Sequence, residues 1–218
     1  MREDICSIPI TDIFEVQDGC PLCRLQAILD ARVVDYMLGG AMMEPDIREE
    51  TNKIGFCPKH LNQMMQQKHR LALALLLETH IAELTAEKNS RFAAKLQKVN
   101  DGCYMCDKIN WGIENLQKTI YKLYETQEEF RQMFDTQPAF CLKHAQQLLD
   151  GASKKNMRKQ LGRFTDSVCN ITKNYLQDLK GDLRTFCNAF DYRSTDKAGL
   201  ERTKDAIERA ALVLAPKA

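Results

Sequence analysis

The strongest constraint on the fold of this chain is a pattern of cysteine and histidine that occurs twice. Each copy contains a C-x2-C pair and, further along, a phenylalanine followed by a C-x2-H pair. In chain order, the residues of these four pairs are Cys20, Cys23, Cys57, His60, Cys103, Cys106, Cys141 and His144. The number of residues between the two C-x2-C pairs differs by one from the number between the two C-x2-H pairs. This near-equal spacing indicates an internal duplication.

The order and spacing of these residues are typical of metal ligands. A C-x2-C turn brings two sulfurs close enough to share an ion at about 2.3 Å, and cysteine and histidine three apart project from one face of a first helical turn. Three thiolates and one imidazole form a closed tetrahedral Cys3His set, the usual arrangement of structural zinc. We therefore expect two zinc ions, one held by Cys20, Cys23, Cys57 and His60. The second set consists of Cys103, Cys106, Cys141 and His144.

Other cysteine chemistries are left open or disfavoured by the same residues. An iron–sulfur cluster is the alternative cofactor, because three cysteines and one histidine can also hold one. Neither C-x2-C pair continues to histidine, which excludes covalent haem attachment, and no βαβ pattern surrounds Cys20 and Cys23 to suggest a thioredoxin-like site. A thiol-based redox sensor remains a competing interpretation.

The pattern of apolar residues predicts an all-α protein. All six prolines lie outside residues 59–137 and 139–215, so long helices are permitted in both ranges. Apolar residues recur every three or four positions after each C-x2-C pair, and again within residues 69–99 and 164–186. We therefore expect each cysteine-containing pair to open a helix, one helix over 69–99 and another over 164–186. We predict a helical bundle made of two repeats, 1–99 and 100–218, each containing a long helix and one Cys3His site. A further helix is expected over 195–214.

Composition restricts the partners and the compartment. The formal net charge is +1, so no global field favours nucleic acid or acidic partners. The longest apolar run, residues 71–77, is far shorter than the roughly 20 residues needed to cross a bilayer. The N-terminal residues lack the features of a signal or transit peptide. These features predict a cytoplasmic protein that does not act in a membrane. In the reducing cytoplasm, nine cysteines are more typical of metal binding than of disulfides.

One basic segment and several isolated residues offer other functions. Residues 154–163 contain five cations and no acid. If the segment is a helix, its cations share one face, which could contact the phosphates of a nucleic acid. The simpler interpretation is that this face is exposed to solvent. Cys169 and Cys187 are interpreted as packing residues, His80 as a buried or boundary histidine, and the role of Cys6 is left open.

Four residues suggest a small-molecule site. The aromatic and methionine side chains of Tyr36, Met42, Met43 and Trp111 could line a pocket between the two halves, because helical bundles bind ligands between facing helices. Core filling is the simpler interpretation of the same residues. The ligand itself is not predicted.

The chain resembles a known family along most of its length. The resemblance rests on Ile8-Pro9-Ile10, the CPLC and GFCPKH segments, the CYMC and FCLKH segments, and Phe190-Asp191-Tyr192-Arg193. By these motifs the sequence is similar to domain of unknown function 6062, a bacterial group of helical proteins. The resemblance implies the architecture and no reaction.

Together these features predict a non-enzymatic, zinc-stabilised helical module that binds another protein. An enzyme or redox sensor with a ligand pocket, and nucleic-acid binding through 154–163, are the alternatives.

Overall fold

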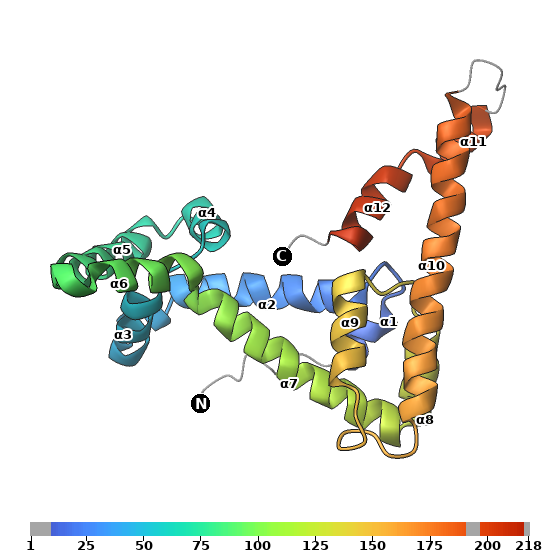
Figure 1. Cartoon of the computed structure of the whole chain (residues 1–218), viewed down its shortest axis with the longest axis horizontal. Coiled ribbons are helices and arrows are strands. Elements are labelled where there is room, and N and C mark those ends of the chain that lie inside the picture. The colour runs from blue at the N-terminus through green and yellow to red at the C-terminus, as the bar shows by residue number, and fades with distance from the viewer. Residues whose placement is uncertain (1–9, 191–196, 216–218) are drawn as a thin grey trace. The chain divides into compact units, whose positions relative to one another are not determined.

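The computed structural model describes residues 10–190 and 197–215, and every regular element in these residues is a helix (Figure 1). The elements are α1 Ile10–Glu15, α2 Pro21–Leu38, η1 Ala41–Met43, α3 Pro45–Ile54, α4 Pro58–Gln66, α5 Arg70–Thr85, α6 Asn89–Asp101, α7 Tyr104–Thr126, α8 Glu128–Asp135, α9 Leu142–Gly151, α10 Leu161–Ala189, α11 Lys197–Thr203 and α12 Ala206–Leu214. The predicted all-α class is confirmed. None of the described helices is both long and apolar enough to span a membrane.

The helices form two compact units. The described part of unit 1 is residues 26–114, and that of unit 2 is residues 10–25, 115–190 and 197–215. The chain therefore passes between units within α2 and again within α7. These units do not follow the predicted repeats, because unit 2 takes its first segment from the first repeat. The repeat boundary after residue 99 stays a prediction about the sequence.

Unit 1 has a mainly aliphatic core. The part of α2 that belongs to unit 1 buries Leu29, Val33 and Met37, and α3 packs against α5 and η1. Of the aromatic side chains described in this unit, those of Phe56 and Tyr104 are buried. Both lie beside residues of the C-x2-H and C-x2-C pairs, so the unit 1 core is continuous with the segments that carry the candidate ligands.

Unit 2 has an aromatic core. Phe134 of α8 lies at the centre, with its ring centroid 5.1 Å from those of Tyr124 and Phe164 and 5.2 Å from that of Phe140. The ring of Phe14 stacks on Phe134 at 5.5 Å. Aromatic pairs at these distances contribute about 0.5–1.5 kcal/mol beyond their buried area. The rings join α1, α7, α8 and α10 around one centre.

The single helix expected over 69–99 is wrong: α5 ends at Thr85 and α6 begins at Asn89. Residues 86–88 form a break in which the Ala86 N–H bonds to the carbonyls of Ala82 and Leu84 and Lys88 is extended. Polar residues at 87–90 interrupt the apolar stripe here, and asparagine and serine favour helix starts over helix interiors.

The helix expected over 195–214 is also divided. Its described part forms α11 and α12, separated at Lys204 and Asp205. Both pack against α10, whose bounds include the whole predicted 164–186 helix.

Residues 154–160 of the basic segment 154–163 are not helical, contrary to the prediction of one helix over the segment. Residues 152–160 form turns and bends before α10 begins at Leu161. The Ser153 carbonyl accepts the N–H groups of Asn156 and Met157 at 2.9 and 2.8 Å, and the Met157 side chain is fully buried. Burial of this methionine fixes a compact loop, so the cations do not share a helix face.

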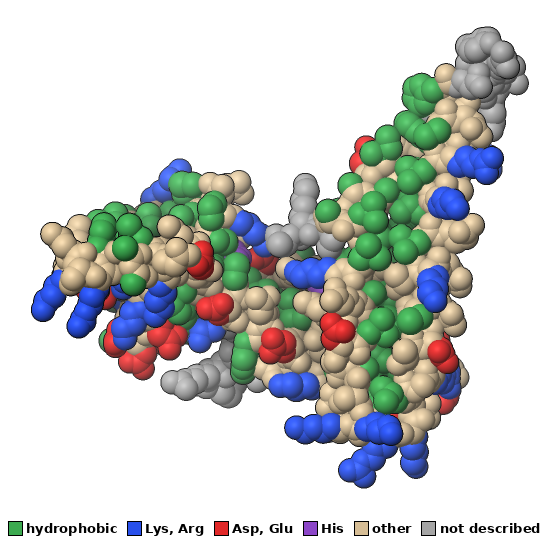
Figure 2. Space-filling model, viewed as in Figure 1, with side chains coloured by type: hydrophobic (Ala, Val, Ile, Leu, Met, Phe, Trp, Pro, Cys, Tyr) green, Lys and Arg blue, Asp and Glu red, His purple; other side chains and the backbone are tan. Residues whose placement is uncertain are grey.

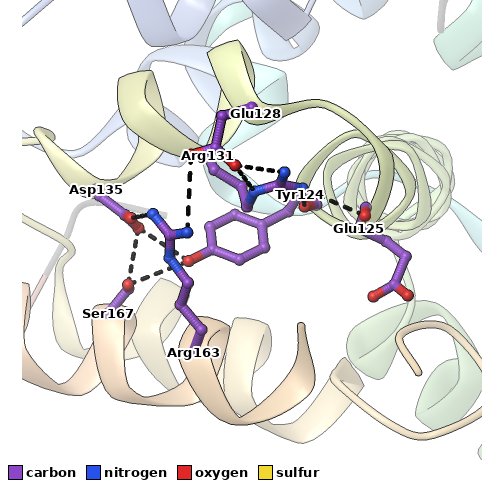
Figure 3. Close-up of polar contacts among 7 residues, drawn as sticks. All are labelled: Tyr124, Glu125, Glu128, Arg131, Asp135, Arg163 and Ser167. Atoms are coloured by element: carbon purple, nitrogen blue, oxygen red, sulfur yellow. Dashed lines mark hydrogen bonds and ion pairs between the residues drawn. The ribbon is translucent and has the colours of Figure 1, made fainter. Parts of the chain in front are cut away.

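Acidic side chains hold the end of this loop and the start of α10. The Glu125 carboxylate accepts the N–H groups of Lys159 and Gln160 at 2.9 and 3.1 Å. Figure 3 shows Arg163 of α10 directed at Asp135 of α8, with an Nη2–Oδ2 distance of 2.8 Å. The side chains of Tyr124 and Ser167 donate to the other oxygen of Asp135 at 2.9 and 2.7 Å. This network connects three helices of unit 2. It also pairs Arg163, one of the five cations of the basic segment, with an acidic residue.

Candidate metal centres

All four cysteine-containing pairs lie at helix starts. Cys20, Cys57, Cys103 and Cys141 directly precede α2, α4, α7 and α9. The Cys57 and Cys141 carbonyls accept the N–H groups four residues on at 3.0 and 2.8 Å, which closes the first turn of each helix. Proline follows Cys20 and Cys57, where its fixed φ suits the first helical position. The sequence prediction that each pair opens a helix is confirmed.

In unit 2 the structure brings together Cys20, Cys23, Cys141 and His144. The Nδ1 atom of His144 lies 3.1 Å from the Sγ of Cys141, 3.3 Å from that of Cys23 and 3.7 Å from that of Cys20. The sulfurs of Cys23 and Cys141 are 3.5 Å apart. All four donor atoms lie within 4.8 Å of one another, and Cys141 and His144 are buried.

In unit 1 the corresponding group is Cys57, His60, Cys103 and Cys106. The His60 Nδ1 atom lies 3.2 Å from the Sγ of Cys103, 3.3 Å from that of Cys57 and 3.4 Å from that of Cys106. The sulfurs of Cys57 and Cys106 are 3.8 Å apart. The two groups therefore have the same composition and nearly the same internal distances.

The predicted partnership of the pairs is wrong. The order along the chain predicts that Cys20 and Cys23 share an ion with Cys57 and His60, whereas the structure combines the C-x2-C pair of each repeat with the C-x2-H pair of the other. The physical reason is the length of the helix between the pairs. At a rise of 1.5 Å per residue, α2, with its 18 residues, carries the chain roughly 27 Å away from Cys20 before the second pair is reached. Each unit still contains one complete Cys3His group.

Both groups fit the donor geometry of a single tetrahedral ion. With Zn–S near 2.3 Å and Zn–N near 2.0 Å, tetrahedral donors are separated by about 3.5–3.8 Å. The measured S–S distances of 3.5 and 3.8 Å match this range. The S–N distances of 3.1–3.7 Å lie within a few tenths of an ångström of it. The eight residues can therefore hold two metal ions without rearrangement of the backbone.

The electrostatics favour one thiolate in each group, on the cysteine of the C-x2-H pair. Hydrogen bonds from Cys20 and Cys23 lower the pKa of Cys141 well below its usual value. Burial raises the pKa of Cys57, but the His60 N–H and neighbouring thiols outweigh it, so the net pKa is lowered. The contact with Cys141 raises the pKa of Cys20 to about 11. Because metal ligands must be deprotonated, ion binding would release protons from the C-x2-C cysteines.

A carboxylate behind His60 is a feature that sequence reasoning missed. Asp30 of α2 is 7% exposed, and its Oδ1 lies 2.7 Å from the Nε2 of His60. Its Oδ2 accepts from Gln63 at 2.6 Å and pairs with Lys59 at 2.9 Å. Burial raises the pKa of Asp30, but these three partners outweigh it and the net pKa is lowered. Carboxylates commonly orient metal-binding histidines in this way. The available signal was an acidic residue next to the apolar stripe of α2.

The remaining cysteines and His80 lie outside both groups. Cys169 is half-buried in α10, Cys187 is exposed, and Cys6 lies outside the described residues. His80 is buried, and its Nδ1 atom lies 3.0 Å from the Asn52 carbonyl oxygen. This contact agrees with the predicted satisfied core histidine.

The four residues proposed to line a pocket between the halves all belong to unit 1. Tyr36 donates to Glu44 at 3.1 Å, and Met43 is 71% exposed. Trp111 is exposed on α7, on the wall of a cavity within unit 1. The structure therefore supports a cavity at Trp111 rather than one shared by these four side chains.

Comparison with known proteins identifies a family. Neither the curated proteins nor the solved structures gave a match to this chain. The sequence does match a family described as "Family of unknown function (DUF6062)", over residues 1–95 and 82–217. The two overlapping matches, together with the two Cys3His groups, support a duplicated all-α fold. The chain belongs to the DUF6062 family of unknown function.

Proposed function

We propose that this protein is a non-enzymatic cytoplasmic module in which two structural zinc ions hold the helices in place so that they can bind another protein. The observation that carries the proposal is the pair of Cys3His groups, each spaced as the donors of one tetrahedral ion. Zinc accepts this ligand set more commonly than other metals do, in sites that serve folding rather than catalysis.

The donor spacing favours zinc over an iron–sulfur cluster. A cluster distributes its ligands over several iron atoms, which requires wider separations than four donors on one ion. All donors of each group lie within 4.8 Å of one another. One tetrahedral ion per group satisfies this spacing.

The ligand number favours a structural role. Catalytic zinc sites use three protein ligands and keep a position for water or substrate, whereas four protein ligands close the coordination sphere. The helix starts that carry the ligands come from different repeats, so each ion would fasten together segments that are far apart in the sequence. Metal binding would then contribute directly to folding.

The exposed apolar side chains of unit 2 favour a protein partner. In α12, Ala206, Ala210 and Val213 are buried, while Ile207 and Leu214 are 52% and 60% exposed. Figure 2 shows further hydrophobic side chains along the visible face of α10. Apolar surface of this kind is typical of protein interaction sites.

Metal analysis and chelation test the proposal together. We expect two zinc ions per purified chain, and removing them with a chelator should lower the helical circular dichroism signal and the melting temperature. Structural zinc sites contribute on the order of 10 kcal/mol of apparent binding energy. Unchanged helicity and melting after complete metal removal would refute the structural role, and a brown protein containing iron would refute zinc.

A redox sensor is the second candidate, favoured by the 3.5 Å between the sulfurs of Cys23 and Cys141. Peroxide would oxidise two such thiolates to a disulfide, with peroxide reduced to two hydroxide ions and the ion released. Release of one ion at low peroxide, restored by a thiol reductant, would favour this function over the scaffold.

Nucleic-acid binding rests on the basic loop. The side chains of Lys154, Lys155, Arg158 and Lys159 are exposed and form no ion pair within the described residues. Binding that weakens steeply with salt, and is lost when these four cations are changed to glutamine, would favour this function.

A further inference from the structure

Unit 1 contains an open cavity of about 460 Å³ that lies outside the metal-ligand groups. Its walls come from the C-terminal part of α3, the last turn of α6 and the first two turns of α7. This volume falls within the range of about 300–1,000 Å³ that is usual for small-molecule sites. The cavity can therefore accept a ligand of metabolite size.

One wall of the cavity is aromatic. Tyr104, Lys108 and Trp111 follow one another at intervals of four and three residues, which places them on one face of α7. The Trp111 side chain is 57% exposed, whereas Tyr104 is 4% exposed. An indole that keeps half of its surface open beside a cavity provides a face on which a planar ring can stack.

The rest of the cavity is charged. Three lysines, at 53, 98 and 108, and two acids, at 50 and 107, belong to its lining. The Lys108 Nζ atom lies 4.9 Å from the centroid of the Tyr104 ring and 3.7 Å from Glu50. Lys98 forms no ion pair in the part of the chain that the structure describes. Figure 2 shows basic and acidic side chains close together in this part of unit 1. The cavity thus offers both cations for an anion and carboxylates that can accept from hydroxyl or amino groups.

The aromatic wall is fixed by the segments that carry the unit 1 metal group. Tyr104 directly follows Cys103, and its N–H donates to the Gly55 carbonyl at 3.0 Å. Gly55 in turn lies two residues before Cys57. These backbone contacts hold the wall in place independently of any ligand, as expected of a preformed site.

We propose that this cavity binds a nucleoside phosphate, with the base stacked on Trp111 and the phosphate held by the lysines. Stacking on an aromatic side chain accepts every base, because each base has a flat π-face. Glu50 and Asp107 accept hydrogen bonds from ribose hydroxyls or from a base amino group. The proposal does not depend on the identity of the metal, because none of the three interactions uses it.

The chain contains one tryptophan, so its fluorescence reports directly on this site. Titration of the metal-loaded full chain with AMP, GMP, CMP and UMP should give saturable quenching by at least one of them. The corresponding nucleoside should bind at least tenfold more weakly, and inorganic phosphate alone should cause no quenching. If no mononucleotide gives a saturable change up to millimolar concentration, or if nucleoside and nucleotide bind equally, the proposal is wrong.

A charge variant separates binding at the cavity from binding elsewhere. Lys98→Gln removes an exposed cation that forms no ion pair within the described residues and should leave the fold intact. It should weaken nucleotide binding about tenfold, because it removes a charged hydrogen-bond donor to the phosphate. Lys180→Gln, an exposed lysine of α10, is the matched control and should bind like the parent chain. Trp111→Ala, measured by calorimetry, should also weaken binding at least tenfold. Equal affinity for Lys98→Gln and Lys180→Gln would overturn the proposal.

Discussion

The two units contain the same four ligand types at nearly the same distances, but their surroundings differ. In unit 2, Phe134 contacts several other aromatic rings, whereas the core of unit 1 is mainly aliphatic. In unit 1, Asp30 orients His60, whereas the residue at the corresponding position after the other C-x2-C pair is Ile113. The same ligand group thus occurs in unit 2, which has a closely packed aromatic core, and in unit 1, which lacks such a core within its described residues. We expect unit 1 to depend more on its ion.

Double cysteine variants give the largest effect and test which pairs belong together. Cys20→Ser with Cys141→Ser removes two ligands of one group, so the chain should retain one zinc ion. Cys20→Ser with Cys57→Ser removes one ligand from each group, and both ions should be lost or held weakly. Native mass spectrometry counts the ions, and Cys169→Ser is the control that should retain two.

Hydrogen exchange on the same variants sharpens the comparison of the units. In the Cys20 and Cys57 double variant, which should lose or weakly hold both ions, amides across residues 26–114 should exchange faster than those of unit 2, because the aromatic core of unit 2 remains. If the Cys20 and Cys57 double variant keeps one ion at full affinity, the ligands pair within each repeat and the swapped arrangement is wrong.

The sequence predicted the helical class and the eight residues that the structure gathers, because helical periodicity and ligand spacing are local properties. It did not predict which pairs combine. That partnership depends on where α2 and α7 carry the chain, which is a property of the whole fold. The within-repeat pairing of Cys20 with Cys57 was the simplest choice from the sequence, and no local signal opposed it.

The errors in secondary structure have a similar origin. Residues 154–160 have helical spacing of their cations, yet tertiary contacts decide their conformation: Met157 is buried in unit 2 and Glu125 accepts the N–H groups at the end of the loop. Asp30 was missed for the same reason, since its role appears when His60 is folded against it. Local patterns indicate which segments are helical, but not which polar groups meet.

Asp30→Asn tests the second difference between the units. The neutral amide of asparagine is a weaker hydrogen-bond acceptor for the His60 N–H than the charged carboxylate of Asp30. The ion in unit 1 should therefore be held about 10–100-fold more weakly, which is the usual effect of losing such a partner. Competition with a chromogenic chelator measures the two affinities separately. The ion in unit 2 is an internal reference and should not change.

Asp35→Asn is the matched control for this change. Asp35 lies on the same helix but is exposed, so its amide variant should keep both affinities. If Asp30→Asn weakens both ions equally, or neither, Asp30 does not orient His60 for metal binding, and the difference between the units has another cause.

The smallest expected effect comes from the residue before the phenylalanine of each C-x2-H pair, which is Gly55 in unit 1 and Ala139 in unit 2. Gly55 has φ 79° and ψ −162°, a conformation that is nearly exclusive to glycine. A Cβ atom there would lie 3.1 Å from His80 and Val99. Gly55→Ala should therefore destabilise unit 1 by about 1–3 kcal/mol.

Ala139→Gly is the reciprocal change in unit 2. No described residue other than glycine has positive φ, so Ala139 occupies an ordinary conformation, and its replacement should cost about 0.4–1 kcal/mol through the unfolded chain. Denaturant titration of the zinc-loaded variants, followed by hydrogen exchange in each unit, measures both effects. Because the Gly55 carbonyl accepts the Tyr104 N–H at 3.0 Å, Gly55→Ala should also weaken the unit 1 ion, whereas Ala139→Gly should leave both affinities unchanged. Equal destabilisation by the two changes would show that the backbone before the C-x2-H pair is equivalent in the two units, and that their difference lies in the core and in Asp30 alone.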